Sequence, residues 1–181
     1  MNEETQPTRA SHDWEALHKQ GEKLLQSGRL DEAIAHFRKA LEAEERAQTH
    51  NRLGVALARL GRTSEALAAF QRSVALDPDQ PSAWTNLGNA FQELGDLNAA
   101  REAYEKALAL DPEYPLAHHN LGALLRKEGK YDAAVRHLKQ ANRLERRRLA
   151  EEARQKGGVA RSQAFLVILL VLLVLILLRS R

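Results

Sequence analysis

The chain has 181 residues, of which 44% are hydrophobic and 28% are charged, a mixture that allows one ordinary domain and an appendage. It contains no cysteine, which excludes disulfide bonds, thiolate zinc sites and a cysteine nucleophile. The net charge of +3 is uneven, because residues 143–181 hold nine Lys or Arg and three Asp or Glu, whereas residues 1–142 are slightly acidic. An acidic body argues against nucleic acid as a partner, since that function requires a basic surface.

The N-terminal segment, residues 1–13, is polar and partly acidic, and we expect it to be disordered. It lacks the apolar stretch of a secretory signal peptide. We therefore expect the body of the chain to remain in the cytoplasm.

Three columns of small residues recur at a period of 33 or 34 residues, which is the pattern of a repeat protein. The columns are Gly21, Gly54, Gly88 and Gly122; Ala33, Ala66, Ala100 and Ala134; and Gly28, Gly61, Gly95 and Gly129. The spacing predicts an all-α solenoid of four helix-turn-helix units over residues 14–145, with units at 14–46, 47–80, 81–114 and 115–146.

The third unit shows the pattern most clearly. Trp84, Leu87 and Phe91 are spaced to share one face of a first helix, and a glycine at position 95 ends that helix. A second helix then places Ala100 and Tyr104 on one face, and Asp111-Pro112 stops it. The small residues at 88 and 100 allow the two helices to approach closely.

These units resemble tetratricopeptide repeats. The third unit matches the Trp, Leu-Gly, aromatic, Ala, aromatic and Pro positions of that family with Trp84, Leu87, Gly88, Phe91, Ala100, Tyr104 and Pro112. In the second and fourth units His50 and His118 replace the Trp. The resemblance implies a scaffold whose first helices form a concave groove that holds a protein or a peptide.

We expect the groove to be lined by the stripe of each first helix that lies beside the packing stripe. This predicts a binding surface of Gln48, Asn51, Arg59, Ser82, Thr85, Asn89, Gln92, Glu93, His119, Arg126 and Lys127. The surface would run from acidic at its N-terminal end to basic near Arg126 and Lys127, which favours an extended ligand with an acidic group there. The alternative is a solvated face with incidental charges.

Some members of the family hold the C-terminal carboxylate of heat-shock chaperones with Lys, Arg and Asn on three successive first helices. The equivalent positions here hold His18, Glu22, Arg52, Ser82 and Asn86 in units one to three, and Asn51, Val55, Asn86, Leu116 and Asn120 in units two to four. Only one Asn matches the family pattern, so we predict that such peptides do not bind.

The fourth unit has no closing proline, so its second helix should continue as a solvated, basic juxtamembrane helix over residues 146–161. We expect Gly157-Gly158 to break that helix and to form a hinge. The excess of Arg and Lys in this region favours attraction to anionic lipid headgroups.

Residues 165–178 are fourteen consecutive Phe, Leu, Val or Ile, followed by a basic tail at residues 179–181. We predict a single transmembrane helix over residues 162–178, because such a run favours insertion into a bilayer. A buried core helix is the alternative, but no further element remains to cover it. The chain therefore resembles a tail-anchored protein, and its composition favours a bacterial inner membrane over the outer membrane of an organelle.

Motifs for catalysis are absent: the sequence has no P-loop and no serine-centred elbow. We expect no enzyme activity, no cofactor, no metal and no small-molecule substrate. Among the histidines, His50 and His118 should pack like the Trp that they replace, whereas His36 and His137 should be solvated.

Two other functions remain compatible with the sequence, namely a self-assembling structural protein and an accessory subunit of a membrane enzyme complex. The apolar span has no small-xxx-small pattern, so close pairing of spans is not favoured.

Overall fold

The computed structural model describes the backbone of residues 9–179 and the side chains of residues 13–155. This part of the chain holds eight α-helices and no strand: α1 (Arg9–Gln26), α2 (Leu30–Ala43), α3 (Ala47–Arg59), α4 (Thr63–Leu76), α5 (Pro81–Glu93), α6 (Leu97–Leu110), α7 (Pro115–Lys127) and α8 (Tyr131–Arg179). Helix α1 begins inside the segment that was expected to be disordered. The expectation of disorder is therefore wrong for residues 9–13, and residues 1–8 lie outside the described part.

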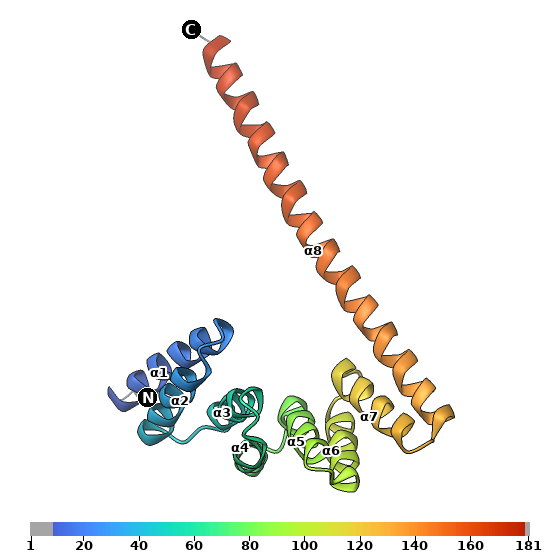
Figure 1. Cartoon of the computed structure of the whole chain (residues 1–181). Coiled ribbons are helices and arrows are strands. Elements are labelled where there is room, and N and C mark those ends of the chain that lie inside the picture. Colours follow the sequence, from blue (N-terminus) through green and yellow to red (C-terminus); the bar gives the residue numbers. More distant parts are fainter. Residues whose placement is uncertain (1–8, 180–181) are drawn as a thin grey trace, which may run out of the picture.

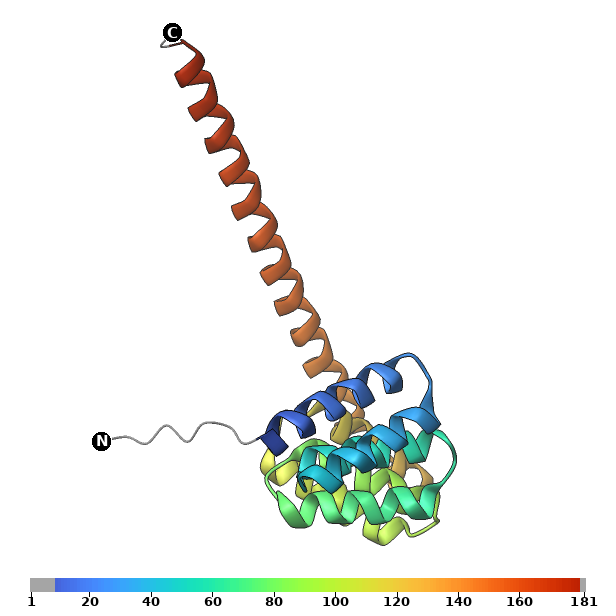
Figure 2. The ribbon, with the colours of Figure 1, turned by 90° about the vertical axis from the view of Figure 1, so that its left-hand side faces the viewer.

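The helices form four antiparallel pairs stacked in a row, as the period predicts (Figure 1). Within a pair, α1 packs on α2, α3 on α4, α5 on α6, and α7 on the first part of α8. The first helices of successive pairs also touch one another, so that α1, α3, α5 and α7 share one side of the stack. Helix α8 then leaves the body as a single long rod (Figure 2).

A glycine in the left-handed conformation ends each first helix. The φ angles are +78° at Gly28, +74° at Gly61, +86° at Gly95 and +77° at Gly129. This conformation is costly for residues with a Cβ atom, and it lets the chain reverse within three residues. The prediction that a glycine at position 95 ends its helix is confirmed.

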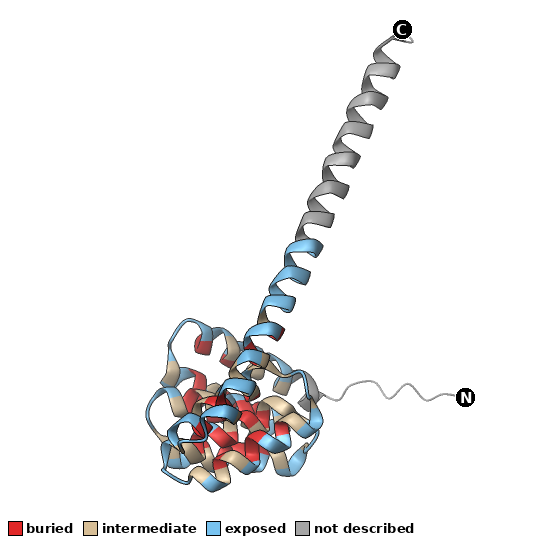
Figure 3. Cartoon of the chain, turned by 90° about the vertical axis from the view of Figure 1, so that its right-hand side faces the viewer, coloured by how far each residue is buried: buried red, intermediate tan, exposed pale blue. Residues whose placement is uncertain are grey.

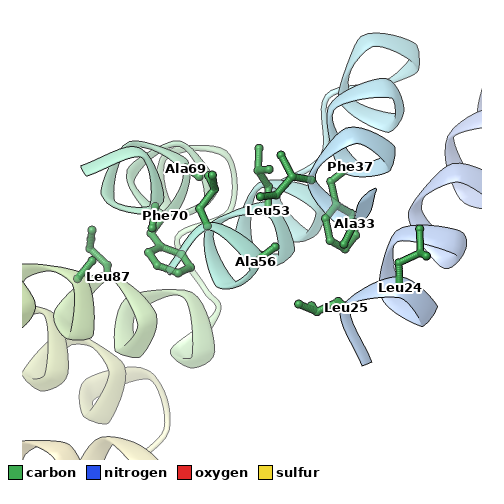
Figure 4. Packing of buried hydrophobic residues seen from close by; sticks show 13 residues of the cluster. Leu24, Leu25, Ala33, Phe37, Leu53, Ala56, Ala69, Phe70 and Leu87 are labelled. Atoms are coloured by element: carbon green, nitrogen blue, oxygen red, sulfur yellow. The ribbon is translucent and has the colours of Figure 1, made fainter. Parts of the chain in front are cut away.

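In each pair a large side chain of the second helix packs directly against a glycine of the first. A Cβ atom on Gly88 would lie 2.5 Å from Tyr104 Cε1, and one on Gly54 would lie 2.5 Å from Phe70 Cε1. Phe37 covers Gly21 in the same way. Figure 4 shows Phe37 and Phe70 between their helices, surrounded by leucine and alanine side chains.

The buried side chains form two clusters that meet at one aromatic residue. The first cluster extends from Leu24 to Ala90, and the second includes Tyr104 and Leu124. Phe91 packs against both. The buried residues lie inside the solenoid, whereas α8 beyond it is exposed as far as its side chains are described (Figure 3).

Helix α8 is continuous from Tyr131 to Arg179, so the break predicted at Gly157-Gly158 is wrong. Glycine in a helix interior costs about 1 kcal/mol relative to alanine, a penalty that neighbouring helix-forming residues can offset. Ion pairs one turn apart stabilise the exposed part: Arg147 contacts Glu151, and Arg148 contacts Glu145 and Glu152.

Within the residues whose side chains are described, no helix is both long enough and apolar enough to cross a membrane. The predicted span at residues 162–178 and the basic tail at 179–181 lie outside the residues whose side chains are described.

Replacing Gly88 by alanine should destabilise the solenoid. The added Cβ would overlap the Tyr104 ring and would lie 3.1 Å from the Ala100 carbonyl oxygen, so the two helices must separate. Overpacking of this kind costs about 1–3 kcal/mol, which exceeds the gain of up to about 1 kcal/mol in helix propensity. Thermal unfolding followed by circular dichroism will measure the difference.

Gly122→Ala is the comparison variant, because its new Cβ would meet a backbone carbonyl at nearly the same distance, Ala134 O at 3.2 Å, but would meet the side chain of Leu138 rather than an aromatic ring. A leucine can change rotamer, so this variant should lose less stability than Gly88→Ala. Equal stability of Gly88→Ala and the parent chain would contradict the packing argument.

Candidate functional site

A cavity of about 520 Å³ lies on the side of the solenoid formed by the first helices. Residues of α1, α3, α5 and α7 line it, together with two residues of the connecting loops; the lining is His18, Glu22, Gln48, Asn51, Arg52, Val55, Gln80, Ser82, Asn86, Tyr114 and Leu116. A second cavity of about 310 Å³ adjoins it between α3 and α5, and Val55 and Asn86 line both. We call the two together the concave groove.

Polar side chains link each first helix to the one before it across the groove. Arg52 Nε lies 3.0 Å from Glu22 Oε1, Asn86 Nδ2 donates to Asn51 Oδ1 at 2.8 Å, and Asn120 Nδ2 donates to Asn89 Oδ1 at 2.7 Å. The three donors occupy equivalent positions, 34 residues apart.

The middle link differs from the other two for a simple chemical reason. The position that accepts the bond is Glu22 in the first repeat and Asn89 in the third, but it is Val55 in the second. Valine has no acceptor, so Asn86 bonds to Asn51 instead. The second and third repeats thereby present amide groups at the centre of the groove.

Asn89 connects the groove to the core. Its Oδ1 also accepts a hydrogen bond of 2.8 Å from the hydroxyl of Tyr104, the residue that covers Gly88. Burial raises the pKa of Tyr104 to about 12. The hydroxyl therefore stays protonated and depends on Asn89 for its acceptor.

At the N-terminal end, a chain of hydrogen bonds fixes the histidine that faces the groove. The indole of Trp14 donates to Thr49 Oγ1 at 3.0 Å, and Nδ1 of His18 lies 3.0 Å from the same hydroxyl oxygen. Burial lowers the pKa of His18. The ring is thus held in its neutral form.

Six predicted binding residues line the concave groove. Gln48, Asn51 and Ser82 face the larger cavity, and Arg59, Asn89 and Glu93 face the smaller one. Whether these residues bind a ligand stays a prediction.

Two predicted lining residues are poorly placed to touch a ligand. Thr85 is completely buried and donates its hydroxyl proton to the Pro81 carbonyl oxygen at 2.8 Å, so its assignment to the groove surface is wrong. Gln92 is half-buried, and its Oε1 atom is buried without a hydrogen-bond partner.

The remaining predicted residues belong to the last repeat. His119 lines a separate cavity of about 420 Å³ between α7 and α8. Arg126 and Lys127 are exposed in the last turn of α7 and line neither cavity of the concave groove. Lys127 is nevertheless equivalent by repeat to Arg59 and Glu93, which do face the groove.

The N-terminal end of the groove is less negatively charged than predicted. Glu22 is the acidic residue that faces the cavity there, and Arg52 of the next helix neutralises it. Sequence reasoning left Arg52 and Asn86 out of the predicted surface, although polar side chains recur at these positions and at Asn120 with the repeat period.

The described side chains contain no group of three or more His, Asp or Glu arranged to hold a metal ion. The prediction that His137 is solvated is wrong. It is half-buried, and its Nδ1 lies 2.9 Å from Nδ1 of His118. Burial is the main cause that lowers the pKa of His137, and the neighbouring His118 and Arg136 add to it.

Asn89→Ala should destabilise the chain although the residue is exposed. Without the amide oxygen, the buried Tyr104 hydroxyl loses its acceptor, which costs about 1–3 kcal/mol in the free energy of unfolding. In a Tyr104→Phe background, where no hydroxyl needs an acceptor, the same substitution should cost clearly less. Equal losses in both backgrounds, measured by chemical denaturation, would show that the bond contributes nothing.

Four family profiles match the chain and together cover residues 18–152. Profiles described as tetratricopeptide repeat match residues 18–81, 69–102 and 117–152, and one described as TPR repeat matches residues 88–127. Among curated protein sequences, none is significantly similar to this chain.

Solved structures share the fold. MamA from Desulfovibrio magneticus, residue 41 to its end, is 28% identical, with a TM-score of 0.67 over 74% of this chain and 76% of that one. A thermophilic TPR protein of Thermus thermophilus is 26% identical, with a TM-score of 0.68 over 73% and 74%. The first TPR of Spaghetti (RPAP3), bound to the HSP90 peptide SRMEEVD, is 26% identical, with a TM-score of 0.64 over 66% of this chain and 95% of that one.

Proposed function

Because the chain is a tetratricopeptide-repeat protein, we propose that it is an adaptor that holds an extended peptide or protein segment in its concave groove and is anchored by its C-terminal segment to the cytoplasmic face of a membrane. Proteins of this family are generally scaffolds rather than enzymes, and one relative holds a peptide in its structure.

The observation that carries the proposal is the polar lining of the concave groove. Asn51, Asn86 and Asn89 present amide groups along its centre, and Gln48 and Ser82 add further donors and acceptors. An extended peptide has one donor and one acceptor per residue along its backbone, which such groups can satisfy. Because Glu22 is paired with Arg52, the N-terminal end of the groove has no strong charge preference.

A charge preference arises at the C-terminal end of the groove. Arg126 and Lys127 are exposed in the last turn of α7, beyond the cavities that define the groove, and neither belongs to an ion pair among the described residues. Nearby Glu128 contacts Arg101 and Lys130 instead. We assign these two cations to an acidic group of the ligand.

The membrane proposal rests on the sequence of the C-terminal segment. Its fourteen consecutive apolar residues favour insertion by about 6 kcal/mol on a biological insertion scale. Helix α8 carries the chain from the last repeat toward this segment. The composition favours the inner membrane of a bacterium.

Deleting residues 162–181 should release the protein from membranes without unfolding it, since the clusters of buried residues lie within residues 24–134. Carbonate-washed membranes and circular dichroism will measure the two effects. Retention of the truncated chain by washed membranes would refute the anchor.

The double variant Arg126→Glu, Lys127→Glu should capture its partner less well, by about fivefold at low salt if each exposed pair contributes about 0.5 kcal/mol. A photo-reactive amino acid at Gln48, in the groove, will trap the partner in native membranes, and the cross-linked yield is the measurement. The loss should shrink at high salt, because salt screens exposed charges.

Two controls accompany this experiment. Lys106→Glu, Lys139→Glu makes the same change in charge at exposed positions of the second helices and should leave the yield unchanged. The photo-reactive residue at Gln71, exposed on α4 and outside the cavities, should trap nothing specific. An undiminished yield in the Arg126, Lys127 variant would refute the assignment of these cations to an acidic group of the ligand. Equal trapping from Gln71 would refute the groove as the binding site.

The peptide SRMEEVD should not bind this chain, in contrast to the RPAP3 relative. The Arg52 side chain is already paired with Glu22, and Asn86 is bonded to Asn51, so no cluster of free cations awaits a terminal carboxylate at these positions. Fluorescence anisotropy with labelled peptide is the measurement. Saturable binding abolished by Arg52→Ala would overturn this prediction.

A further inference from the structure

The smaller cavity of the concave groove lies where one side chain of the second repeat is short. Ala58 of α3 occupies the position that holds Leu25 in the first repeat, Gln92 in the third and Arg126 in the fourth. Of the four repeats, only the second has no long side chain at this position. A cavity of about 310 Å³ remains beside Ala58, between α3 and α5.

The buried part of this cavity is apolar. Its two fully buried lining residues are Phe70 and Ala90, and Val55 and Ala58 beside them are half-buried. An apolar side chain that enters such a cavity removes its own surface and that of the lining from water, which is favourable. The size of the cavity suits a single side chain of a bound segment.

Two amides that line the same cavity are held in fixed orientations, and each keeps one polar group free. Asn86 donates from Nδ2 to Asn51, and its own Oδ1 receives no hydrogen bond from the described residues. Asn89 accepts at Oδ1 from Tyr104 and Asn120, and its Nδ2 has no acceptor within the described part of the chain. The pair thus offers one acceptor and one donor, which complement the N–H and C=O groups of a peptide residue. Because both amides are already ordered, binding would cost them little entropy.

An unpaired carboxylate adds a charge preference to the cavity. Glu93 of α5 lines it, is exposed, and belongs to no ion pair among the side chains that the structure describes. Arg59 also lines it, but its Nη1 donates to the Leu25 carbonyl oxygen of the preceding repeat, at 3.2 Å. Glu93 is therefore available to a basic group of a ligand.

We propose that this cavity is the specificity pocket of the groove, and that it takes one large aliphatic side chain, Leu or Ile, of a segment that carries Lys or Arg within two residues. The inference rests on the proposed function, because it names the residue pattern of the ligand held in the same groove. The backbone of the aliphatic residue would donate to Asn86 and accept from Asn89. The basic side chain would contact Glu93.

The test is a selection of random dodecapeptides, displayed on phage, for binding to the full chain in detergent. Selected peptides are then synthesised, and their affinities are measured by fluorescence anisotropy. We expect peptides that bind the parent chain to share a Leu or Ile with Lys or Arg within two residues. Replacing that Leu or Ile by Ser in the peptide should weaken binding at least about tenfold, because the apolar contact is lost.

Two variants of the chain test the pocket from the other side. Ala58→Leu copies the first repeat and fills the cavity, so it should also weaken binding at least about tenfold. Glu93→Lys copies the fourth repeat and should weaken binding about threefold at low salt, with a smaller effect at high salt. Ala75→Leu and Glu102→Lys make the same changes at exposed positions outside the groove and should leave the affinities unchanged.

Circular dichroism will verify that each variant is as helical as the parent chain. The proposal is overturned if peptides that compete with the cross-link from Gln48 share no aliphatic residue, or if they bind Ala58→Leu as tightly as the parent chain. Either result would leave the groove in place as a binding site. If no selected peptide competes with that cross-link, the pocket and the groove are both refuted.

Discussion

The contact between a glycine of one helix and a large side chain of the next is the constraint on which the structure depends. It brings the two helices of each repeat close enough for Phe37, Phe70 and Tyr104 to be fully or almost fully buried. In the fourth repeat Leu138 takes the aromatic position against Gly122 and is only half-buried. The terminal repeat, which no further repeat covers, is thus the least tightly packed.

The same contact also sets the geometry of the groove. Tyr104 lies on Gly88, and its hydroxyl reaches Asn89, the next residue of the first helix. A side chain that holds the core together therefore also orients an amide in the groove. Phenylalanine at this position in the first and second repeats cannot form that bond, so their groove residues have no such link to the core ring.

The sequence was sufficient to predict the solenoid, because Gly, Ala and large apolar residues recur with one period at the positions where the two helices of a pair touch. The burial of Thr85 was harder to predict, since it depends on how the neighbouring helices are placed. Asn86 bonds to Asn51 only because Val55 offers no acceptor, a relation that appears when neighbouring helices are placed together. The burial of His137 could have been predicted, because its repeat equivalents are the buried Ala69 and Ala103.

Because α8 is continuous, its length sets the distance between the solenoid and the C-terminal segment. Among the described side chains of α8, the last with an ion-pair partner in the solenoid is Arg147, whose Nη1 lies 2.9 Å from Glu113 Oε1. From there to Arg161 the helix rises about 20 Å at 1.5 Å per residue. With residues 162–178 in a bilayer, the solenoid would lie roughly that distance from the membrane surface. A continuous helix, rather than a flexible linker, would connect the two. With the proposed anchor, such a spacing would suit a ligand that itself projects from the membrane, and it would keep the groove clear of the lipid headgroups.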